Sequence, residues 1–161
     1  MRAERQPDDP IDNMADVPAV PPPGGFVVLD ASVWVARLVS VDAFHQSSKN
    51  WIEAQAERHV TLLSPALLLA EAAGTISRRT RDPGLAKRAI QALEELPGLR
   101  LVEMERTLMK EAARLAAELG MRGADACYVA LAAQLGLPLL TLDQEQRSRS
   151  AGVVEILSLG E

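Results

Sequence analysis

Cysteine and aromatic residues are scarce in this sequence, and each shortage excludes a class of protein. Cys127 is the only cysteine, and aromatic residues make up 3% of the chain. One cysteine excludes an intrachain disulfide and a cysteine-rich zinc module, and it points to a reducing compartment. No run approaches the roughly 20 apolar residues of a membrane span, and the N-terminus lacks the apolar core of a signal peptide. We therefore expect a soluble, cytoplasmic protein with an aliphatic core.

An excess of positive charge is also missing. The formal net charge is −5, and residues 1–25 contribute −3 of it because they hold two arginines and five acidic residues. The remainder is nearly neutral, which argues against broad clamping of duplex DNA, since that needs many cationic contacts with phosphates. A small anionic ligand, or a phosphate bridged by a metal ion, is still compatible with this charge.

The common nucleotide and nucleophile motifs are absent as well. The sequence contains no GxGxxG, no GxxxxGKS/T and no GxSxG, so a dinucleotide site, a P-loop and a hydrolase nucleophile elbow are unsupported. His45 and His59 lie in a polar helix and at a strand entrance, and we expect structural or solvent-facing roles for both. Cys127 lies in an apolar helix, where packing is its expected role.

Short apolar segments alternate with longer amphipathic ones after an opening stretch of different composition. Residues 1–25 are rich in Pro and Asp without periodicity, which predicts a disordered tail, whereas residues 26–159 have the texture of one domain. Strands are predicted at 26–30, 59–64, 99–104, 137–143 and 153–157, with helices between them. Such strands indicate an α/β fold whose parallel sheet is covered on both faces.

Four acidic residues stand where a folded domain seldom places them. Asp30 and Asp143 follow the first and fourth predicted strands, where ligands bind in open α/β sheets. Glu71 and Asp125 interrupt the apolar stripes of two predicted helices. Charges on faces that should be buried need partners.

Each of these acids also has an ordinary interpretation. Asp30, Asp125 and Asp143 lie near helix starts, where Asp is a favoured cap or first-turn residue. Ser64 and Pro65 predict a helix start that would place Glu71 two turns inside its helix, with a buried salt bridge as the alternative role. If all four acids meet, a divalent cation is needed to offset their repulsion, and oxygen-only sites suit Mg²⁺ or Mn²⁺.

Several segments carry a resemblance to a known family. They are VLDASVWV at 28–35, SPALLLAEAAGTISR at 64–78, GADACYVALAAQLGLPLLTLD at 123–143 and AGVVEI at 151–156. In order and spacing, the chain from Phe26 to Leu159 resembles a PIN domain of the VapC toxin type. The resemblance implies a five-stranded parallel sheet in the order 3-2-1-4-5, with Asp30 and Asp143 on adjacent strands. It also implies that Asp30, Glu71, Asp125 and Asp143 bind divalent metal for RNA hydrolysis.

The resemblance implies further residues and partners. Ser32 and Thr141 match small polar positions that support the acidic site, although Ser32 has a helix cap as its alternative role. After Asp143, the sequence departs from members that carry an apolar residue there. A cognate antitoxin and a homodimer are implied as partners. A catalytically silent PIN fold that binds RNA or protein is the alternative function.

One basic stretch is a candidate for guiding the RNA backbone. It comprises Arg78, Arg79, Arg81, Lys87 and Arg88. A solvated helix end, with positive charge favourably placed at a helix C-terminus, is the competing interpretation.

Overall fold

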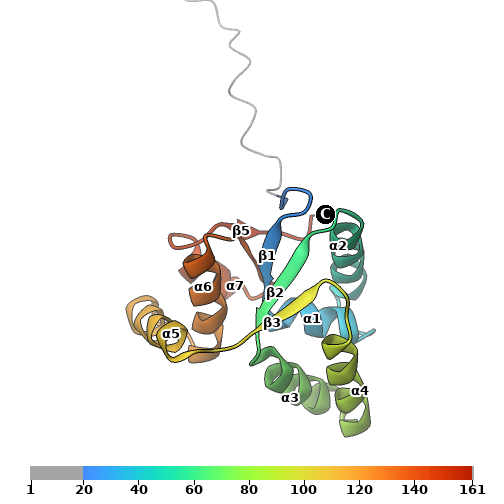
Figure 1. The fold of residues 1–161 in the computed structure, drawn as a ribbon. Coiled ribbons are helices and arrows are strands. Elements are labelled where there is room, and N and C mark those ends of the chain that lie inside the picture. Colours follow the sequence, from blue (N-terminus) through green and yellow to red (C-terminus); the bar gives the residue numbers. More distant parts are fainter. Residues whose placement is uncertain (1–19, 161) are drawn as a thin grey trace, which may run out of the picture.

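A parallel five-stranded sheet runs through the centre of the computed structural model, which describes residues 20–160 (Figure 1). The strands are β1 (Phe26–Leu29), β2 (Thr61–Pro65), β3 (Leu99–Val102), β4 (Leu139–Leu140) and β5 (Ile156–Leu157). The helices are α1 (Ala31–Leu38), α2 (His45–Glu57), α3 (Leu68–Thr80), α4 (Pro83–Glu94), α5 (Arg106–Leu119), α6 (Gly123–Leu135) and α7 (Gln144–Ser150). The strand order is β3-β2-β1-β4-β5, which confirms the fold that the resemblance implied.

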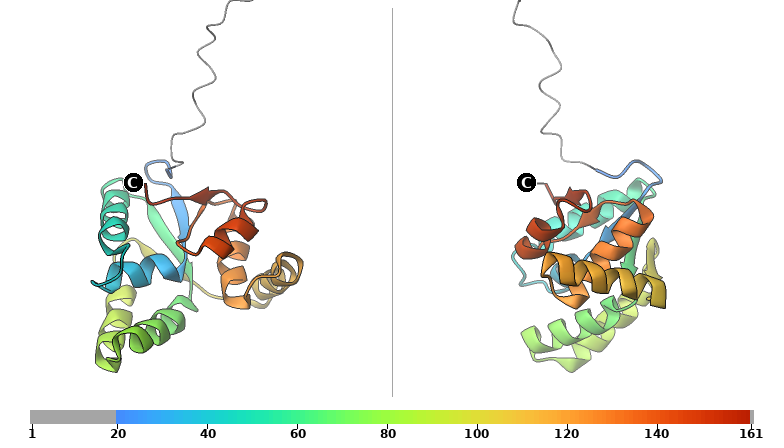
Figure 2. Two further views of the ribbon diagram at one scale, coloured as in Figure 1. Left: turned by 180° about the vertical axis from the view of Figure 1, so that it is seen from behind. Right: turned by 90° about the vertical axis from the view of Figure 1, so that its left-hand side faces the viewer.

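The alternation of side chains along β1 builds two separate cores. Val27 and Leu29 pack in a cluster with residues of α1 to α4, whereas Val28 packs with residues of α5 and α6. Figure 2 shows these two groups of helices on opposite sides of the sheet. Because both faces are covered, the strand is a continuous apolar run in the sequence instead of an alternating one.

Helix α6 is buried around most of its circumference because it lies between the sheet and α5. All of its residues from Ala126 to Ala132 are buried, which explains why it lacks a polar face. Cys127, at 3% exposure, is part of this core. The packing role predicted for the cysteine is confirmed.

The predicted helix start at Ser64 and Pro65 is wrong, because both residues end β2. Thr61 N donates to Gly25 O in the ladder between β2 and β1, and the two-residue repeat of that ladder brings the nitrogen of Pro65 opposite Leu29 O. Proline has no hydrogen to donate there. The buried hydroxyl of Ser64 donates to Leu29 O instead, at 2.6 Å. The Ser-Pro pair therefore ends strand β2 and does not cap a helix.

The chain enters the domain before Phe26. Arg58 donates a hydrogen bond to Pro21 O at 2.7 Å, and Gly24 N donates to Arg58 O at 2.9 Å. Residues 20–25, assigned to the tail from composition, therefore contact α2 at its end. The rest of the predicted tail, residues 1–19, lies outside the described residues.

All five predicted strands are longer than those observed, and the last two differ most. Strand 137–143 contracts to β4, because residues 141–143 turn towards α7, and strand 153–157 contracts to β5. No helix between residues 20 and 160 has the length and apolar content needed to cross a bilayer.

Candidate active site

Strand β1 delivers Asp30 to the carboxyl edge of the sheet. Its backbone N–H donates to Leu140 O on the neighbouring β4, at 2.9 Å, and its Oδ2 accepts from Ser32 N at 2.9 Å as the N-cap of α1. The capping role that the sequence left open is therefore present. Asp30 is only 5% exposed, and no basic side chain among the described residues pairs with it. Capping alone leaves a buried negative charge without a counter-ion.

Asp143 comes to the same edge after β4. Its Oδ1 accepts from Glu145 N and Gln146 N, each at 2.9 Å, which makes it the N-cap of α7. Its Oδ2 accepts from the guanidinium of Arg122 at 2.7 Å. One oxygen therefore caps α7, and the other is bound to Arg122.

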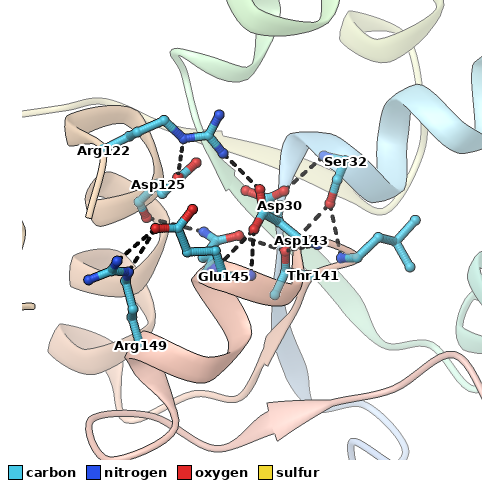
Figure 3. Close-up of polar contacts among 10 residues, drawn as sticks. Asp30, Ser32, Arg122, Asp125, Thr141, Asp143, Glu145 and Arg149 are labelled. Atoms are coloured by element: carbon cyan, nitrogen blue, oxygen red, sulfur yellow. Dashed lines mark hydrogen bonds and ion pairs between the residues drawn. The ribbon is translucent and has the colours of Figure 1, made fainter. Parts of the chain in front are cut away.

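Ser32 and Thr141 hold the turn after β4 against α1. Ser32 Oγ accepts from Leu142 N at 3.0 Å and lies 3.5 Å from Thr141 Oγ1. The buried Thr141 hydroxyl donates to Gln146 Oε1 at 2.6 Å and accepts from Asp143 N at 3.1 Å. These contacts fix the position of Asp143 relative to α1, as Figure 3 shows. Both residues therefore contact the turn that carries Asp143.

Glu71 reaches the site from α3. It lies in the first turn of that helix, so the expectation that it lies two turns inside is wrong, because the helix begins at Leu68 and not at Pro65. Its Oε2 accepts a hydrogen bond of 2.6 Å from the hydroxyl of Tyr128, which comes from α6 in the opposite helical layer. The predicted alternative, a salt bridge, is not formed within the part of the chain that the structure describes.

Asp125 lies in the first turn of α6, and Arg122 immediately precedes that helix. Arg122 Nε donates to Asp125 Oδ2 at 2.7 Å, while its Nη2 donates to Asp143 Oδ2, also at 2.7 Å. Figure 3 shows the guanidinium between the two carboxylates. A single cationic group therefore bridges two of the four acids.

All four predicted acids line one cavity of about 370 Å³. Ser32, Arg122 and Phe44 also line it, and Phe44 is 49% exposed. Arg79 lines the rim and pairs with Asp42 at 2.8 Å. Arg78 and Arg81, predicted with Arg79 as RNA contacts, do not line the cavity.

Burial makes the charged form of three acids unfavourable. It raises the pKa of Asp30, an effect that hydrogen bonds from Ser32 oppose and the negative charge of Asp143 reinforces. Burial also raises the pKa of Glu71 against the hydrogen bond from Tyr128, and that of Asp125 against its bonds with Arg122. Raised carboxylate pKa values in one cleft are typical of functional sites. The cavity would gain stability from a further positive charge.

The donor set fits a hard divalent cation. It consists of carboxylate oxygens, which Mg²⁺ and Mn²⁺ prefer, and a guanidinium already occupies a cationic position between two of them. Residues 20–160 nevertheless contain no group of three or more acidic, histidine or cysteine side chains arranged to hold a metal ion. Asp125 and Asp143 are instead hydrogen-bonded to Arg122, and Glu71 is hydrogen-bonded to Tyr128. A cation in this cavity would compete with Arg122 and Tyr128 for these carboxylate oxygens.

Three residues of the site escaped the sequence analysis. They are Arg122, Tyr128 and Gln146, which is 1% exposed and donates through Nε2 to Asp125 O at 3.2 Å. Arg122 lies three residues before Asp125, and this spacing is the signal that was available for it. Neither His45 nor His59 lines the cavity; His45 Nδ1 instead lies 3.0 Å from Ala36 O.

Known structures share this fold. VapC20 from Mycobacterium tuberculosis, described as a toxin that cleaves the sarcin–ricin loop, matches with a TM-score of 0.67 and 21% identity, covering 81% of this chain and 98% of that one. VapBC2 from Rickettsia felis, bound to a DNA fragment from their promoter, matches with a TM-score of 0.64 and 15% identity, covering 83% and 98%. FitAcB from Neisseria gonorrhoeae matches with a TM-score of 0.61 and 19% identity, covering 83% of this chain and 97% of that one. No curated protein matches the chain.

A family model agrees with these structural likenesses. Residues 27–151 match the model of the PIN domain, a span that contains the sheet from β1 to β4 and all four acids of the cavity. The observed strand order is also the one that the resemblance implied. The chain belongs to the PIN-domain family.

Proposed function

We propose that this protein is a metal-dependent endoribonuclease and the toxin of a type II toxin–antitoxin pair. The observation that supports the proposal most is the convergence of four carboxylates, from β1, α3, α6 and the turn after β4, on one cavity. They are Asp30, Glu71, Asp125 and Asp143. The raised pKa values of three of them indicate a site that favours added positive charge.

In the proposed reaction, water attacks phosphorus, and the bond between phosphorus and one ribose oxygen breaks. The four carboxylates would hold Mg²⁺ or Mn²⁺, and the bound ion would supply activation of water and neutralise the charge that develops on the phosphate. Strand β1 and the α1 cap fix the position of Asp30. Ser32 and Thr141 orient Asp143 through the turn after β4. These contacts fix the backbone at Asp30 and Asp143 before substrate arrives.

The proposed substrate is RNA, and the rim offers contacts for it. Arg79 lies at the cavity with 47% of its side chain exposed, and its ion pair with Asp42 fixes the loop before α2. Arg78 and Arg81 lie at the end of α3, outside the cavity. VapC20, which shares the fold, is described as cleaving an RNA loop. We propose that Arg79 contacts the RNA phosphate nearest the cavity and that Arg78 and Arg81 contact phosphates farther along the RNA.

The proposed protein partners are a cognate antitoxin and a second copy of this chain. VapBC2 and FitAcB, two of the similar structures, are complexes of such a toxin with its antitoxin. The homodimer is proposed because the family resemblance implies it. Light scattering of the protein alone and with the product of an adjacent short gene tests both.

A catalytically silent PIN fold is the second candidate, and one observation favours it. Three carboxylates are engaged by Arg122 or Tyr128 and do not point to a common centre. A protein of this kind would bind RNA or protein through the same surface without cleaving it.

Incubation of purified protein with single-stranded RNA separates the two candidates. The nuclease proposal expects cleavage with Mg²⁺ or Mn²⁺ and none with EDTA. Glu71→Gln and Asp143→Asn should reduce cleavage to the level seen with EDTA. Asp82→Asn is the matched control, because Asp82 caps α4 away from the cavity, and it should cleave like the parent. RNA binding without cleavage under all these conditions would favour the silent fold.

A further inference from the structure

Arg122 differs from every other basic residue near the cavity in its partners. Among residues 20–160, it is the only Lys or Arg whose side chain is hydrogen-bonded to any of the four clustered carboxylates. Arg79, the other basic residue in the lining, pairs with Asp42 instead. Arg149, on α7, pairs with Glu145 outside the cavity. The positive charge inside the acidic cluster therefore comes from one side chain.

The two bonds of Arg122 join the start of α6 to the start of α7 through two carboxylate side chains. Asp125 lies in the first turn of α6, and Asp143, 18 positions later, is the N-cap of α7. The guanidinium bridges both carboxylates through Nε and Nη2. The planar fork of arginine matches such a bridge, whereas the point charge of lysine does not. Arg122 is thus a cationic clamp on two of the proposed metal ligands.

The clamp is also open to solvent. Arg122 is 70% exposed, in contrast to 14% for Asp125 and 28% for Asp143. The arginine lies before α6 and contributes nothing to the buried cluster of that helix. It can therefore turn into water without disturbing the packing, whereas the two carboxylates stay in place. Exposed ion pairs are individually weak, so their exchange is accessible.

We propose that Arg122 is a positioning residue that occupies the place of the cation in the metal-free protein and leaves when a divalent ion binds. The proposal rests on the proposed function, because it takes the four carboxylates as metal ligands. Before binding, the guanidinium holds Asp125 and Asp143 near each other against their mutual repulsion. Binding replaces one monovalent cation by a divalent one. Arg122 therefore lowers the apparent affinity for metal.

Titration of Mn²⁺ into the parent and three variants, without RNA, tests this exchange. Arg122→Gln removes the competitor and should raise the association constant roughly three- to tenfold, as expected for two exposed ion pairs. Arg122→Lys keeps the charge but loses the two-pronged bridge, so a smaller increase is expected. Arg149→Gln is the control, because it removes an equal charge from α7 without touching the four carboxylates, and it should bind like the parent.

A melting curve in EDTA gives an independent readout. Without the clamp, Arg122→Gln should melt slightly below the parent, and saturating Mn²⁺ should remove or reverse that difference. An affinity of Arg122→Gln equal to or below that of the parent would overturn the inference, as would an equal rise in Arg149→Gln. In those cases the parent still binds metal, so the proposed function stands. If no variant and no parent binds Mn²⁺, both the proposed function and this inference are contradicted.

Discussion

Replacement of Asp30 by Asn should stabilise the metal-free protein. The substitution conserves shape, and Asn caps a helix about as well as Asp, so the hydrogen bond from Ser32 N can be kept. What it removes is a negative charge at 5% exposure that faces the charge of Asp143 and has no basic partner among the described residues. The gain should be roughly 0.5–2 kcal/mol, the range seen when a strained functional site is neutralised.

The raised pKa of Asp30 determines how the stability gain of Asp30→Asn changes with pH. Burial raises the pKa of Asp30 in the folded protein above its ordinary value. The folded state therefore holds this proton to higher pH than the unfolded state does. The stabilisation that the bound proton contributes is complete below the pKa of the unfolded state. It is lost as pH rises through the pKa of the folded state. The advantage of Asp30→Asn over the parent should be largest near pH 7 and should shrink as the solution is acidified.

Urea and thermal unfolding in EDTA measure the effect. For a domain of this size, each kcal/mol corresponds to about 3 °C in melting temperature. Asp82→Asn is the control, because Asp82 accepts from Leu85 N as the exposed cap of α4 and lies outside the cavity; its stability should not change. A loss of stability in Asp30→Asn at pH 7, or a gain that does not depend on pH, would refute the reasoning.

Three further predictions concern packing and assembly. Ser64→Ala leaves its buried backbone acceptor and indole donor without a partner and should cost about 2 kcal/mol in urea unfolding, whereas exposed Ser40→Ala should be neutral. Tyr128→Phe removes the hydrogen bond that lowers the pKa of Glu71, so the Glu71 carboxyl should titrate at higher pH in NMR spectra; an unchanged titration would contradict the contact. Light scattering at micromolar concentration should give the mass of a dimer, and a monomer mass would contradict the proposed assembly.

Much of the fold could be predicted because its signals are local. A run such as Val27 to Leu29 is apolar at every position since both sheet faces are covered, and that pattern distinguishes a buried parallel strand. The order of the strands is a different matter, because it depends on which strands pair across long stretches of chain. Only the resemblance supplied it.

The error at Ser64 and Pro65 shows how one local signal can serve two structures. The same pair that caps helices also ends β2, where the serine hydroxyl replaces the hydrogen that proline lacks. The consequence was a wrong depth for Glu71 in α3. The choice between the two structures depends on Leu29 O, which is 35 positions away from Ser64.

The four acids were identified from sequence, but their partners were not. Strand ends and interrupted apolar stripes mark unusual carboxylates, since both features are visible along the chain. The bridge from Arg122 to Asp143 spans 21 positions, and that from Tyr128 to Glu71 spans 57. Such contacts depend on how α3, α6 and α7 meet in space, which periodicity does not encode.

The most direct test of the central claim is the stabilisation by Mg²⁺ of the parent and of Asp30→Asn, Glu71→Gln, Asp125→Asn and Asp143→Asn, with Asp82→Asn as control. With free Mg²⁺ a hundredfold above its dissociation constant, the parent and the control should each gain about 2.7 kcal/mol, or about 8 °C in melting temperature. Each of the four variants should gain much less, because each lacks one ligand of a single site. Equal gains in the parent and all four variants would contradict the claim that these carboxylates form one metal centre.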